Sequence, residues 1–446
     1  MDNPPCRRCV ATSAAIFPGE LCEWVKPDRD LSETIYREIE TLSMTELQCW
    51  TYGGIPFGSL CIPSLRWAMR KHHLCDNETN CALLRKYLAS AVVLATRFEE
   101  IFERIDPRAL VVFNGISYPE AVARHLAKKR NIPVITHEVG LRPYSAFFSH
   151  TDATFREVAL PAGFKLGDEE DARLDAYLAE RWKGKFTMAG IQFWPEMQAL
   201  PDDLEAAIDA HQRMVSIFPN VIFDTSQVHA NVHFEHMFAW LDDVKRVAEG
   251  CPETLFVIRA HPDEDRPGKK SRESVAMWVE SCGIQALPNV RFYSPSDYIS
   301  SYDLIRRSKF VLVYNSSIGL EAAIMGAPVL CAGRGRYTQL PTVFFPESRA
   351  VYDQHLASFL SDEPIHVPHE FVSNARKFLY YELYHASLDL SPFLKPMKSL
   401  PGFVSFTNFD LEGLDGEEDS ALRIITDGIL EQKPFVYPWM DAGGTG

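Results

Sequence analysis

The sequence predicts an α/β protein with two doubly wound domains, each built on a mainly parallel sheet. Length is the first observation, because 446 residues are too many for one ordinary core at about 150 residues per domain. The second is a regular alternation of short apolar runs with amphipathic stretches, clearest between residues 220 and 331. The third is that polar loops follow these runs, as they do at the ligand-binding edge of parallel sheets.

Composition and charge restrict the class of protein. With 46% hydrophobic and 24% charged residues, the chain has the composition of a globular protein. A formal net charge of -15 argues against nucleic-acid binding, which requires a basic surface. No apolar run reaches the roughly 18 to 20 residues that a membrane-spanning helix needs, and the start MDNPPCRRCV lacks a signal-peptide core. We therefore expect a cytoplasmic protein.

The cysteines favour reduced thiols. Ten cysteines are an ordinary number for this length, and several lie in or beside apolar or helical stretches. Cys6 and Cys9 form one CxxC pair, but a zinc site would need a second pair at similar spacing, which the sequence lacks. A metal or redox role at this pair is the less favoured alternative.

A long helix is predicted in the first domain. Apolar residues recur at three-and-four spacing over residues 81–105, with charged residues between them, and Pro107 ends the pattern. No strand comparable to the later ones precedes this helix. The first domain is therefore either atypical or incomplete at its start.

One βαβ unit follows the long helix. The run ALVVF at residues 109–113 predicts a strand buried on both faces, and the next two residues, Asn114-Gly115, predict a turn. Residues 119–130 have proline in the first turn and cations at the end, as helices do. A second strand is expected at 133–136, parallel to the first.

A charged, loop-rich stretch at 163–203 predicts the boundary between the domains, which we place near 190–203. Residues 1–195 then form the first domain and 196–390 the second, with 391–446 as a C-terminal tail that packs back on the first domain.

The second domain shows the alternation most clearly. Its apolar runs are short and uninterrupted, as in strands of a parallel sheet with both faces covered. Ligands of such sheets bind beyond the carboxyl ends of the strands, so the loops there are the first candidates for a site. The predicted strands are 220–224, 254–259, 290–293, 309–314 and 327–331, and the predicted helices are 233–249, 272–282, 299–308 and 317–325.

The most informative loop leads from the strand 309–314 into the next helix. Asn315, Ser316 and Ser317 stand at the helix start, where unpaired N–H groups and small hydroxyls suit a phosphate. Glu321 follows one turn later and could accept both hydroxyls of a ribose. The alternative is that a serine is a plain N-cap and Glu321 complements the helix dipole.

Three further loops follow strands of the same sheet. His261 and Arg259 could donate hydrogen bonds to a pyrophosphate or a carboxylate. Thr225 opens a second polar loop, and Arg334 lies in a third that also holds glycines and an aromatic ring. The alternatives are a structural histidine and solvated turns.

Glu138 is the candidate catalytic base of the first domain. It lies in the segment after the strand 133–136, and sugar transfer needs a base to deprotonate the acceptor hydroxyl. The alternative is that Glu138 caps a loop or pairs with Arg142.

These segments resemble a known family. IRAHPDE and YNSSIGLEAAIMGAPVLCAGRGRYTQ are similar to segments of bacterial capsule polysaccharide biosynthesis proteins, including the Kdo transferases of capsule assembly. VVFNGISYPEAVARHLAKKRNIPVITHEVG and RKFLYYELYHASLDLSPFL resemble other parts of the same group, so the resemblance spans about residues 109–394. It implies a GT-B fold, with two Rossmann-like domains facing a cleft and C-terminal helices.

The resemblance also implies functional residues. In that family the HP motif and the serine-to-glutamate helix start contact the donor, which corresponds here to His261, Ser316, Ser317 and Glu321. The sequence departs from many relatives at Ile116, where they have arginine, and this difference bears on the acceptor.

The expected function is metal-independent transfer of a sugar from a nucleotide sugar to a surface or capsular polysaccharide. The helix terminus and His261, Arg259 or Arg334 would stabilise the leaving group. No cofactor is expected besides the donor as substrate; the acceptor would be a glycan or lipid-linked glycan at the inner membrane. The acidic pairs Asp202-Asp203 and Asp242-Asp243 lie in or beside predicted helices, which disfavours metal chelation there.

Two alternatives stay open at this point. Polyol-phosphate transferases of teichoic-acid type share the HP loop and the serine-rich helix start, although their basic membrane-docking surfaces fit a charge of -15 poorly. A non-catalytic module that binds a nucleotide sugar is the other, since fold alone does not establish catalysis.

Overall fold

The computed structural model describes residues 28–183, 197–396, 404–407 and 420–439, the backbone of 187–188 and 191–192, and the single residues Arg7 and Ala11. Cys6 and Cys9 lie outside this part of the chain, as does much of the predicted domain boundary at 190–203. Contacts divide the chain into two compact units. Met1–Ile62 and Cys75–Pro107 form the first unit, and Pro63–Leu74 and Arg108–Gly446 form the second.

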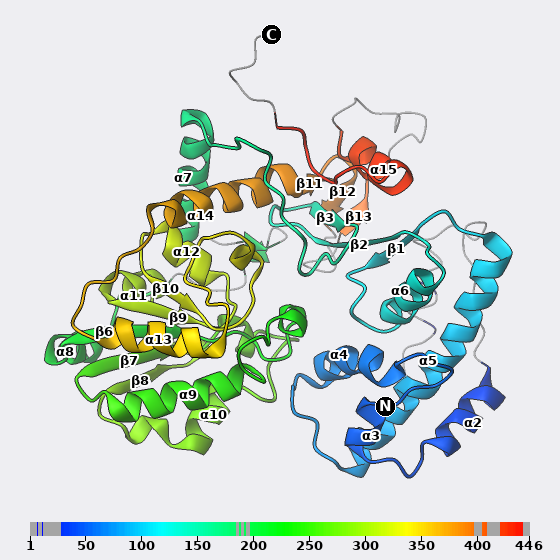
Figure 1. Cartoon of the computed structure of the whole chain (residues 1–446), viewed down its shortest axis with the longest axis horizontal. Helices are drawn as coiled ribbons and strands as arrows, with labels where there is room; N and C mark the ends of the chain where they lie inside the picture. The colour runs from blue at the N-terminus through cyan, green and yellow to red at the C-terminus, as the bar shows by residue number, and fades with distance from the viewer. Residues whose placement is uncertain are drawn as a thin grey trace, which may run out of the picture. The chain divides into compact units, whose positions relative to one another are not determined.

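The first unit is helical. Its described helices are α2 (Arg29–Glu38), α3 (Met44–Gln48), the start of α4 (Phe57–Met69) and α5 (Glu78–Ile105), blue to cyan in Figure 1. Helix α5 confirms the predicted long helix. The Asn77 side chain caps it by accepting a hydrogen bond from the Asn80 N–H.

The second unit begins with residues 63–74, which include the end of α4 and are separated in sequence from the rest of that unit. We call this segment the strap. The backbone N–H groups of His72 and His73 donate to Glu273 Oε2 at 2.8 and 3.0 Å. His73 Nε2 lies 3.1 Å from Nε2 of His236, and Arg70 donates to the Gly268 carbonyl. The strap is therefore held to the rest of the second unit by specific polar contacts.

The first sheet of the second unit confirms the predicted βαβ unit. Strands β1 (Leu110–Phe113) and β2 (Val134–Val139) pair in parallel and are connected by α6 (Glu120–Lys129). Two antiparallel strands, β3 (Ser145–Ser149) and β11 (Leu388–Asp389), extend the sheet in the order β1-β2-β3-β11. The sheet is therefore mixed, with its parallel pair at one edge.

Two details predicted for this sheet are wrong. Strand β1 is not buried on both faces, because it is an edge strand and its alternate side chains, Val111 and Phe113, are 41% and 43% exposed. Strand β2 runs three residues further than predicted, since β3 pairs with its end. His137 and Glu138 therefore lie in a strand and not in the loop after it.

The stretch 163–203, predicted as loop, contains helix α7 (Asp168–Trp182). Four acidic residues in its first turn complement the helix dipole, and Leu174 and Leu178 are buried on one face. The high charge of the exposed positions hides this narrow apolar stripe in the sequence.

The second sheet is fully parallel. Its order, β10-β9-β6-β7-β8, is that of a dinucleotide-binding Rossmann sheet. The predicted α/β fold class with Rossmann-like sheets is thereby confirmed. The strands are β6 (Arg213–Phe218), β7 (Thr254–Arg259), β8 (Val290–Tyr293), β9 (Phe310–Val313) and β10 (Val329–Cys331).

The first predicted strand of this sheet is wrong. Residues 220–224 form a turn, and the strand is β6, at residues 213–218. Ser216 interrupts its apolar run but is buried, where it accepts a hydrogen bond from Ser308 Oγ at 2.7 Å. Val221, Ile222 and Phe223 are apolar because the turn itself packs into the core.

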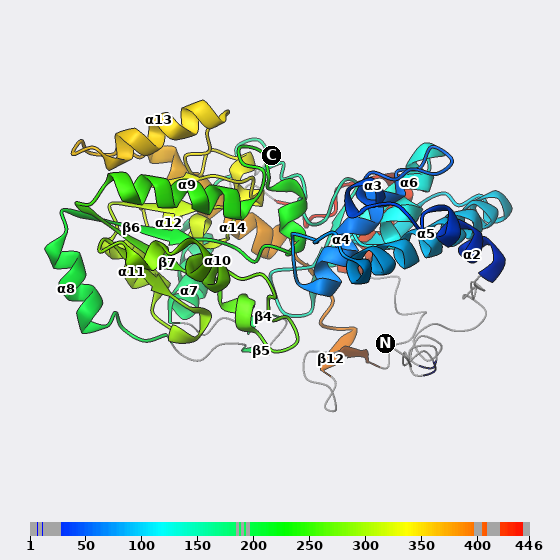
Figure 2. The ribbon, with the colours of Figure 1, turned by 90° about the horizontal axis from the view of Figure 1, so that it is seen from below.

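Helices cover both faces of this sheet (Figure 2). One apolar cluster holds residues from α9 (Met237–Gly250), α10 (Val275–Cys282) and α13 (Arg349–Leu360). The other holds residues from α7, α8 (Asp202–Ala210), α11 (Ser301–Arg307), α12 (Ile318–Ile324) and α14 (His369–Tyr381). Side chains of β6 alternate between the two clusters. This is the double winding that the sequence predicts.

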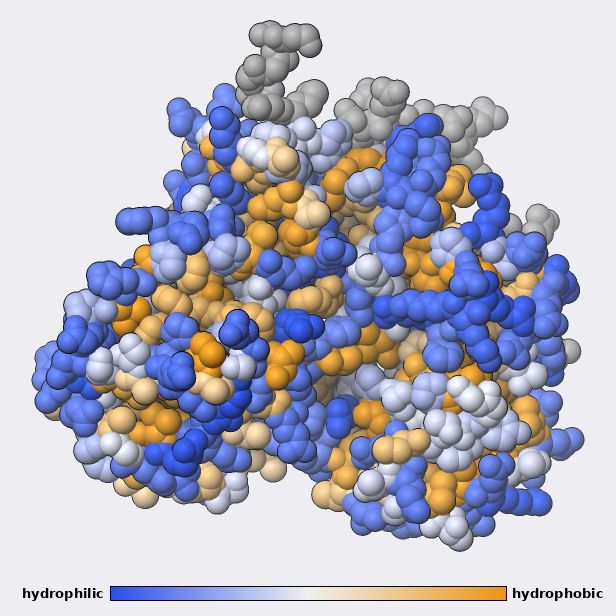
Figure 3. Space-filling view, viewed as in Figure 1, coloured by the Kyte–Doolittle hydropathy of each residue, from blue (hydrophilic) through white to orange (hydrophobic). Residues whose placement is uncertain are grey.

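Hydrophilic side chains dominate the visible surface over α9 and α13, with separate apolar areas between them (left in Figure 3). Within the described ranges, no helix is both long and apolar enough to cross a membrane.

Candidate functional site

The segments after β6 and β9 meet at the carboxyl edge of the parallel sheet, where the strand order reverses. Asn220 Nδ2 donates to Asn315 Oδ1 at 2.9 Å, and Gln227 Nε2 donates to the same oxygen at 3.1 Å. Asn315 is 7% exposed, so these hydrogen bonds between buried amides connect the two segments at the switch point. Such switch points are where open parallel sheets bind ligands.

Ser316 and Ser317 directly precede helix α12, which begins at Ile318, one residue later than predicted. Ser317 is exposed and occupies the N-cap position, but its side chain makes no capping hydrogen bond. The buried Ser316 carbonyl accepts a hydrogen bond from Tyr337 Oη at 2.8 Å. In this structure Ser317 therefore does not act as a plain side-chain N-cap, and its hydroxyl stays accessible.

Glu321 faces the protein interior. It is 4% exposed, Arg181 Nη2 lies 2.6 Å from its Oε1, and the Tyr302 hydroxyl donates to its Oε2. Both carboxylate oxygens are thus engaged by side chains of α7 and α11. A contact between Glu321 and a ribose stays a prediction. It would require the carboxylate to accept hydrogen bonds from the ribose in addition to those from Arg181 and Tyr302.

Asp224, which we did not predict as a site residue, lies beside the switch point. Its Oδ2 is 3.1 Å from Lys269 Nζ, and its Oδ1 accepts from the Ser226 N–H at 3.1 Å. Burial raises the pKa of this carboxyl, but Lys269 and the Ser226 hydrogen bonds outweigh burial and lower it overall. Asp224 is therefore ionised. Thr225, the predicted donor contact, directly follows it and opens the 3-10 helix η2 (Thr225–His229).

His261 follows β7 and starts the 3-10 turn η3 (Pro262–Asp265). Its Nδ1 accepts a hydrogen bond from the Asp263 N–H at 3.1 Å. Burial lowers the pKa of His261, while the carboxylates of Asp263 and Asp224 act in the opposite direction. A neutral imidazole with Nε2 as its N–H donor results.

Arg259 is more enclosed than predicted. Only 2% of it is exposed, and Nη1 donates to the carbonyls of Ala260 and Ser294 at 2.9 and 2.8 Å. Burial lowers its pKa to about 10. Nε and Nη2 have no hydrogen-bond partner among the described residues. The side chain thus links the ends of β7 and β8, and a donor contact stays a prediction.

Glu138 extends from β2 toward the same group of residues. Its Oε1 accepts from the Val139 N–H at 3.0 Å. Burial and the negative charge of Asp224 raise the pKa of Glu138. Hydrogen bonds from Val139 and Asn114 and the positive charge of Arg336 lower it, but the net pKa is raised. Arg142 pairs with Asp389 and not with Glu138, contrary to the alternative considered above.

The loop after β10 supplies two arginines of different kinds. Arg334, the predicted residue, is exposed, with its guanidinium 5.8 Å from the centre of the Phe155 ring. Arg336, which we did not predict, has Nη1 3.6 Å from Glu382 Oε2. Arg156 bonds to the other oxygen of Glu382, the first residue of a short π-helix at Glu382–Ala386. Such π-turns are frequent at functional sites.

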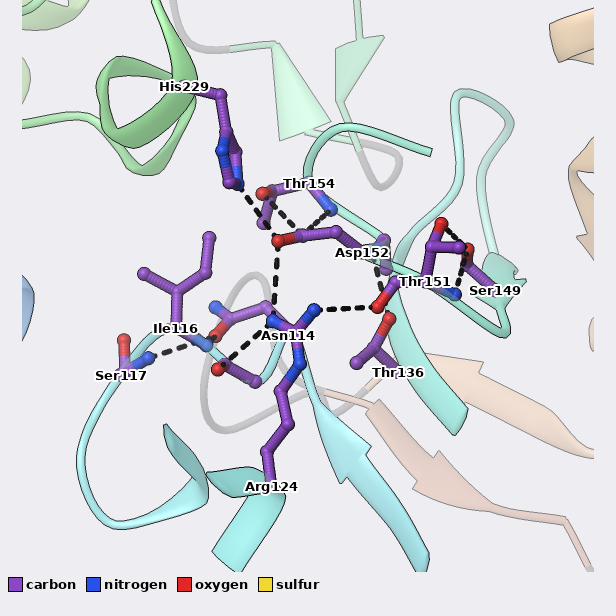
Figure 4. Close-up of polar contacts among 12 residues, drawn as sticks. Asn114, Ile116, Ser117, Arg124, Thr136, Ser149, Thr151, Asp152, Thr154 and His229 are labelled. Carbon is purple, nitrogen blue, oxygen red and sulfur yellow. Dashed lines mark hydrogen bonds and ion pairs between the residues drawn. The ribbon is translucent and has the colours of Figure 1, made fainter. Parts of the chain in front are cut away.

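A polar cluster around Asp152 completes the site (Figure 4). Asp152 Oδ2 lies 2.9 Å from His229 Nε2 and 3.3 Å from Arg124 Nη1. Arg124 Nη1 also donates to the Gly115 carbonyl at 3.3 Å, and the neighbouring Asn114 accepts from the Ile116 N–H at 3.0 Å. Sequence reasoning found the Asn114 turn but missed Asp152, which follows no predicted strand, and His229, which lies in the loop opened by Thr225 but beyond the residues singled out there.

Comparison with known proteins places this geometry in context. Residues 186–340 match the model of the family described as capsule polysaccharide biosynthesis protein. The predicted resemblance to this family is confirmed over that segment. It runs from before β6 to the residue after η6 (Arg336–Gln339) and so includes the loops after β6, β7, β9 and β10 described above.

One curated relative is Protein FixF of Sinorhizobium fredii (strain NBRC 101917 / NGR234), 26% identical over 251 residues. The match covers 52% of this chain, and the chain spans about half, 50%, of that relative.

Three solved structures are similar to parts of this chain, with low TM-scores. The KpsC β-Kdo 2,4 transferase of Thermosulfurimonas dismutans gives a TM-score of 0.41 at 12% identity, covering 66% of this chain and 88% of that one. The KpsC β-Kdo 2,7 transferase of the same organism gives 0.35 at 15% identity, covering 66% and 81%. UDP-GlcNAc 2-epimerase of Neisseria meningitidis gives 0.27 at 16% identity, covering 66% and 80%.

Proposed function

We propose that the chain is a glycosyltransferase that moves a sugar from a nucleotide-activated donor to a surface or capsular polysaccharide. One observation carries the proposal: the segment matching the capsule polysaccharide family, 186–340, contains the loops that the sheet topology gathers at the switch point. The acceptor in this proposal is a glycan or lipid-linked glycan at the inner face of the membrane.

The donor would bind at the carboxyl edge of the parallel sheet. The start of α12 offers the accessible Ser317 hydroxyl and unpaired backbone N–H groups, which suit a phosphate. Lys269, His261 and Arg334 supply further donors around it, so charge that develops on the leaving group can be stabilised without a metal ion. Metal independence stays a prediction.

Two carboxylates would share the chemistry. Asp224 is held ionised by Lys269, whereas burial raises the pKa of Glu138. Opposite shifts in one site often separate an electrostatic role from a proton-transfer role. Asp224 would stabilise the anomeric carbon as it becomes cationic, and Glu138 would accept the proton of the acceptor hydroxyl.

The first prediction concerns Glu138. Replacement by glutamine keeps the shape but removes proton transfer, so release of nucleotide from the productive donor should fall by about 10²- to 10⁴-fold. Nucleotide release is measured with CMP-, UDP-, GDP- and CDP-sugars, and donor binding by thermal shift. A donor at about 100 times its dissociation constant should still stabilise the variant by about 2.7 kcal/mol.

Exposed Glu363 supplies the matched control, since E363Q should release nucleotide at the wild-type rate. Turnover of CDP-linked polyols alone would favour the teichoic-acid type of transferase. Donor binding without release from any donor would instead favour a non-catalytic module, and the proposed activity would be rejected.

A further inference from the structure

His229 is held by a carboxylate that is itself fixed. Asp152 is 9% exposed, and its Oδ1 accepts from the N–H and the hydroxyl of Thr154 at 3.0 and 2.8 Å. Its Oδ2 faces His229 Nε2 at 2.9 Å and Arg124 Nη1 at 3.3 Å. Burial raises the pKa of Asp152, but the hydrogen bonds from His229 and Thr154, the charge that His229 carries when protonated and the charge of Arg124 lower it well below its usual range. Asp152 is therefore an ionised acceptor.

The carboxylate determines the tautomer of His229. An ionised carboxylate has no proton to donate, so His229 Nε2 must carry the hydrogen of the 2.9 Å contact. In the neutral ring the lone pair then lies on Nδ1. No described residue hydrogen-bonds to this nitrogen, and 34% of the side chain is exposed. Nδ1 can thus accept a hydrogen bond from a molecule outside the protein.

The position of the ring connects it to the proposed acceptor side. His229 ends η2, the 3-10 helix that Asp224 caps. Thr136 and Glu138 lie two residues apart in β2, so their side chains point to the same face of the sheet. Thr136 Oγ1 accepts from the N–H of Ala153, the residue after Asp152. Figure 4 shows Asp152 and His229 close to Thr136, and Glu138 lies two residues further along the same strand, so its side chain is on the Thr136 face.

We propose that His229 Nδ1 accepts a hydrogen bond from a hydroxyl of the acceptor sugar, and that Asp152 is the positioning residue that fixes the tautomer required for this contact. The inference rests on the proposed function and names a contact for its acceptor. The partner is a neutral hydroxyl group, because an imidazole with a lone pair toward the ligand attracts a donor and not an anion.

The second prediction is spectroscopic and needs no turnover. Nitrogen-15 spectra of histidine-labelled protein should show His229 protonated at Nε2 and unprotonated at Nδ1. Titration with methyl glycosides of glucose, galactose and N-acetylglucosamine should move the Nδ1 resonance of His229 and leave exposed His366 unchanged. Asp152→Asn should reverse the tautomer, because its amide can donate to Nε2, and should abolish the glycoside effect.

Thr154→Val is the matched control, since it removes a hydrogen bond to Oδ1 but keeps the Oδ2 contact with His229. It should preserve both the tautomer and the glycoside effect, and it also decides the case if Asp152→Asn does not fold. A wild-type Nδ1–H tautomer, or an Nδ1 resonance that no glycoside moves, would overturn the proposal. A glycoside effect without nucleotide release from any donor would reject the glycosyltransferase and keep the sugar contact.

Discussion

Among single residues outside the site, Glu264 is a buried carboxyl group whose pKa is strongly raised. Its side chain is 2% exposed, and its oxygens accept from the Val275 N–H at 3.1 and 3.2 Å. Burial raises its pKa from 4.5 to about 8. The folded protein therefore keeps Glu264 protonated over a pH range in which the unfolded chain ionises it. Stability contributed by the protonated group is complete below pH 4.5 and falls as the pH rises to about 8.

The third prediction follows from this sign. Glu264→Gln should weaken the loss of stability between pH 4.5 and 8, because glutamine keeps a carbonyl acceptor and does not ionise. The measurement is the midpoint of thermal unfolding across that range, compared with the wild type. Exposed Glu280 lies in the helix that follows, and E280Q should leave the profile unchanged. Parallel profiles for E264Q and the wild type would contradict the assignment.

At the scale of elements, helix α12 packs closely on the tyrosine that holds its start. A Cβ added at Gly319 would lie 2.6 Å from Tyr337 Oη and 3.0 Å from Val313 Cγ2. The tyrosine cannot withdraw freely, because its hydroxyl is bonded to the Ser316 carbonyl. The glycine is thus required by the close approach of a side chain.

The fourth prediction is that Gly319→Ala destabilises the protein by about 1–3 kcal/mol through overpacking. Chemical denaturation measures the free energy of unfolding, and thermal shift should show weaker donor binding at the displaced α12. Gly250 at the end of α9 has nothing within 4 Å of an added Cβ. G250A should therefore be neutral or stabilise by about 0.4–1 kcal/mol. Equal effects of the two changes would reject the packing argument.

A strand or helix could be predicted from the sequence where its own residues carry the apolar pattern of that structure. Strand β7 coincides with its prediction because all six residues are buried and the run TLFVIR is largely apolar. Strand β6 is not predicted because Arg213 and Ser216 interrupt its apolar run. Both are hydrogen-bonded to residues far away in sequence: Arg213 donates to the Leu360 carbonyl, and Ser216 accepts from Ser308. Apolar character alone does not distinguish such a strand from a buried turn such as 220–224.

At the scale of the molecule, sheet topology explains which parts of the site were predictable. The rule that loops after parallel strands share an edge predicts from the sequence that Asn315 and His261 lie at the same edge of the sheet. The bonds of Glu321 to Arg181 and of Asp152 to His229 join residues far apart in sequence. No local pattern marks such partners, so their burial and charge state follow only from the fold.

The fifth prediction concerns the strap. His73→Ala removes a side chain that contacts both His236 and Glu273, so the second unit should unfold at a lower temperature. Lys71→Ala is the control in the same segment, because the Lys71 side chain makes no hydrogen bond or ion pair with the described residues. Amide exchange of residues 237–250 should accelerate in the first variant alone, and unchanged exchange would show that the strap contributes no stability there.

The strap also affects how the protein could be divided or recombined. The backbone passes from the first unit to the second at residue 63, returns at residue 75, and leaves again at residue 108. A shortened chain starting at Arg108 would lose the first unit and also the strap, which holds the partners of Glu273 and His236. A hybrid that takes all of residues 1–107 from a relative also takes a foreign strap, so it must exchange the surface that receives residues 63–74 as well, because the two compact units are not consecutive in sequence.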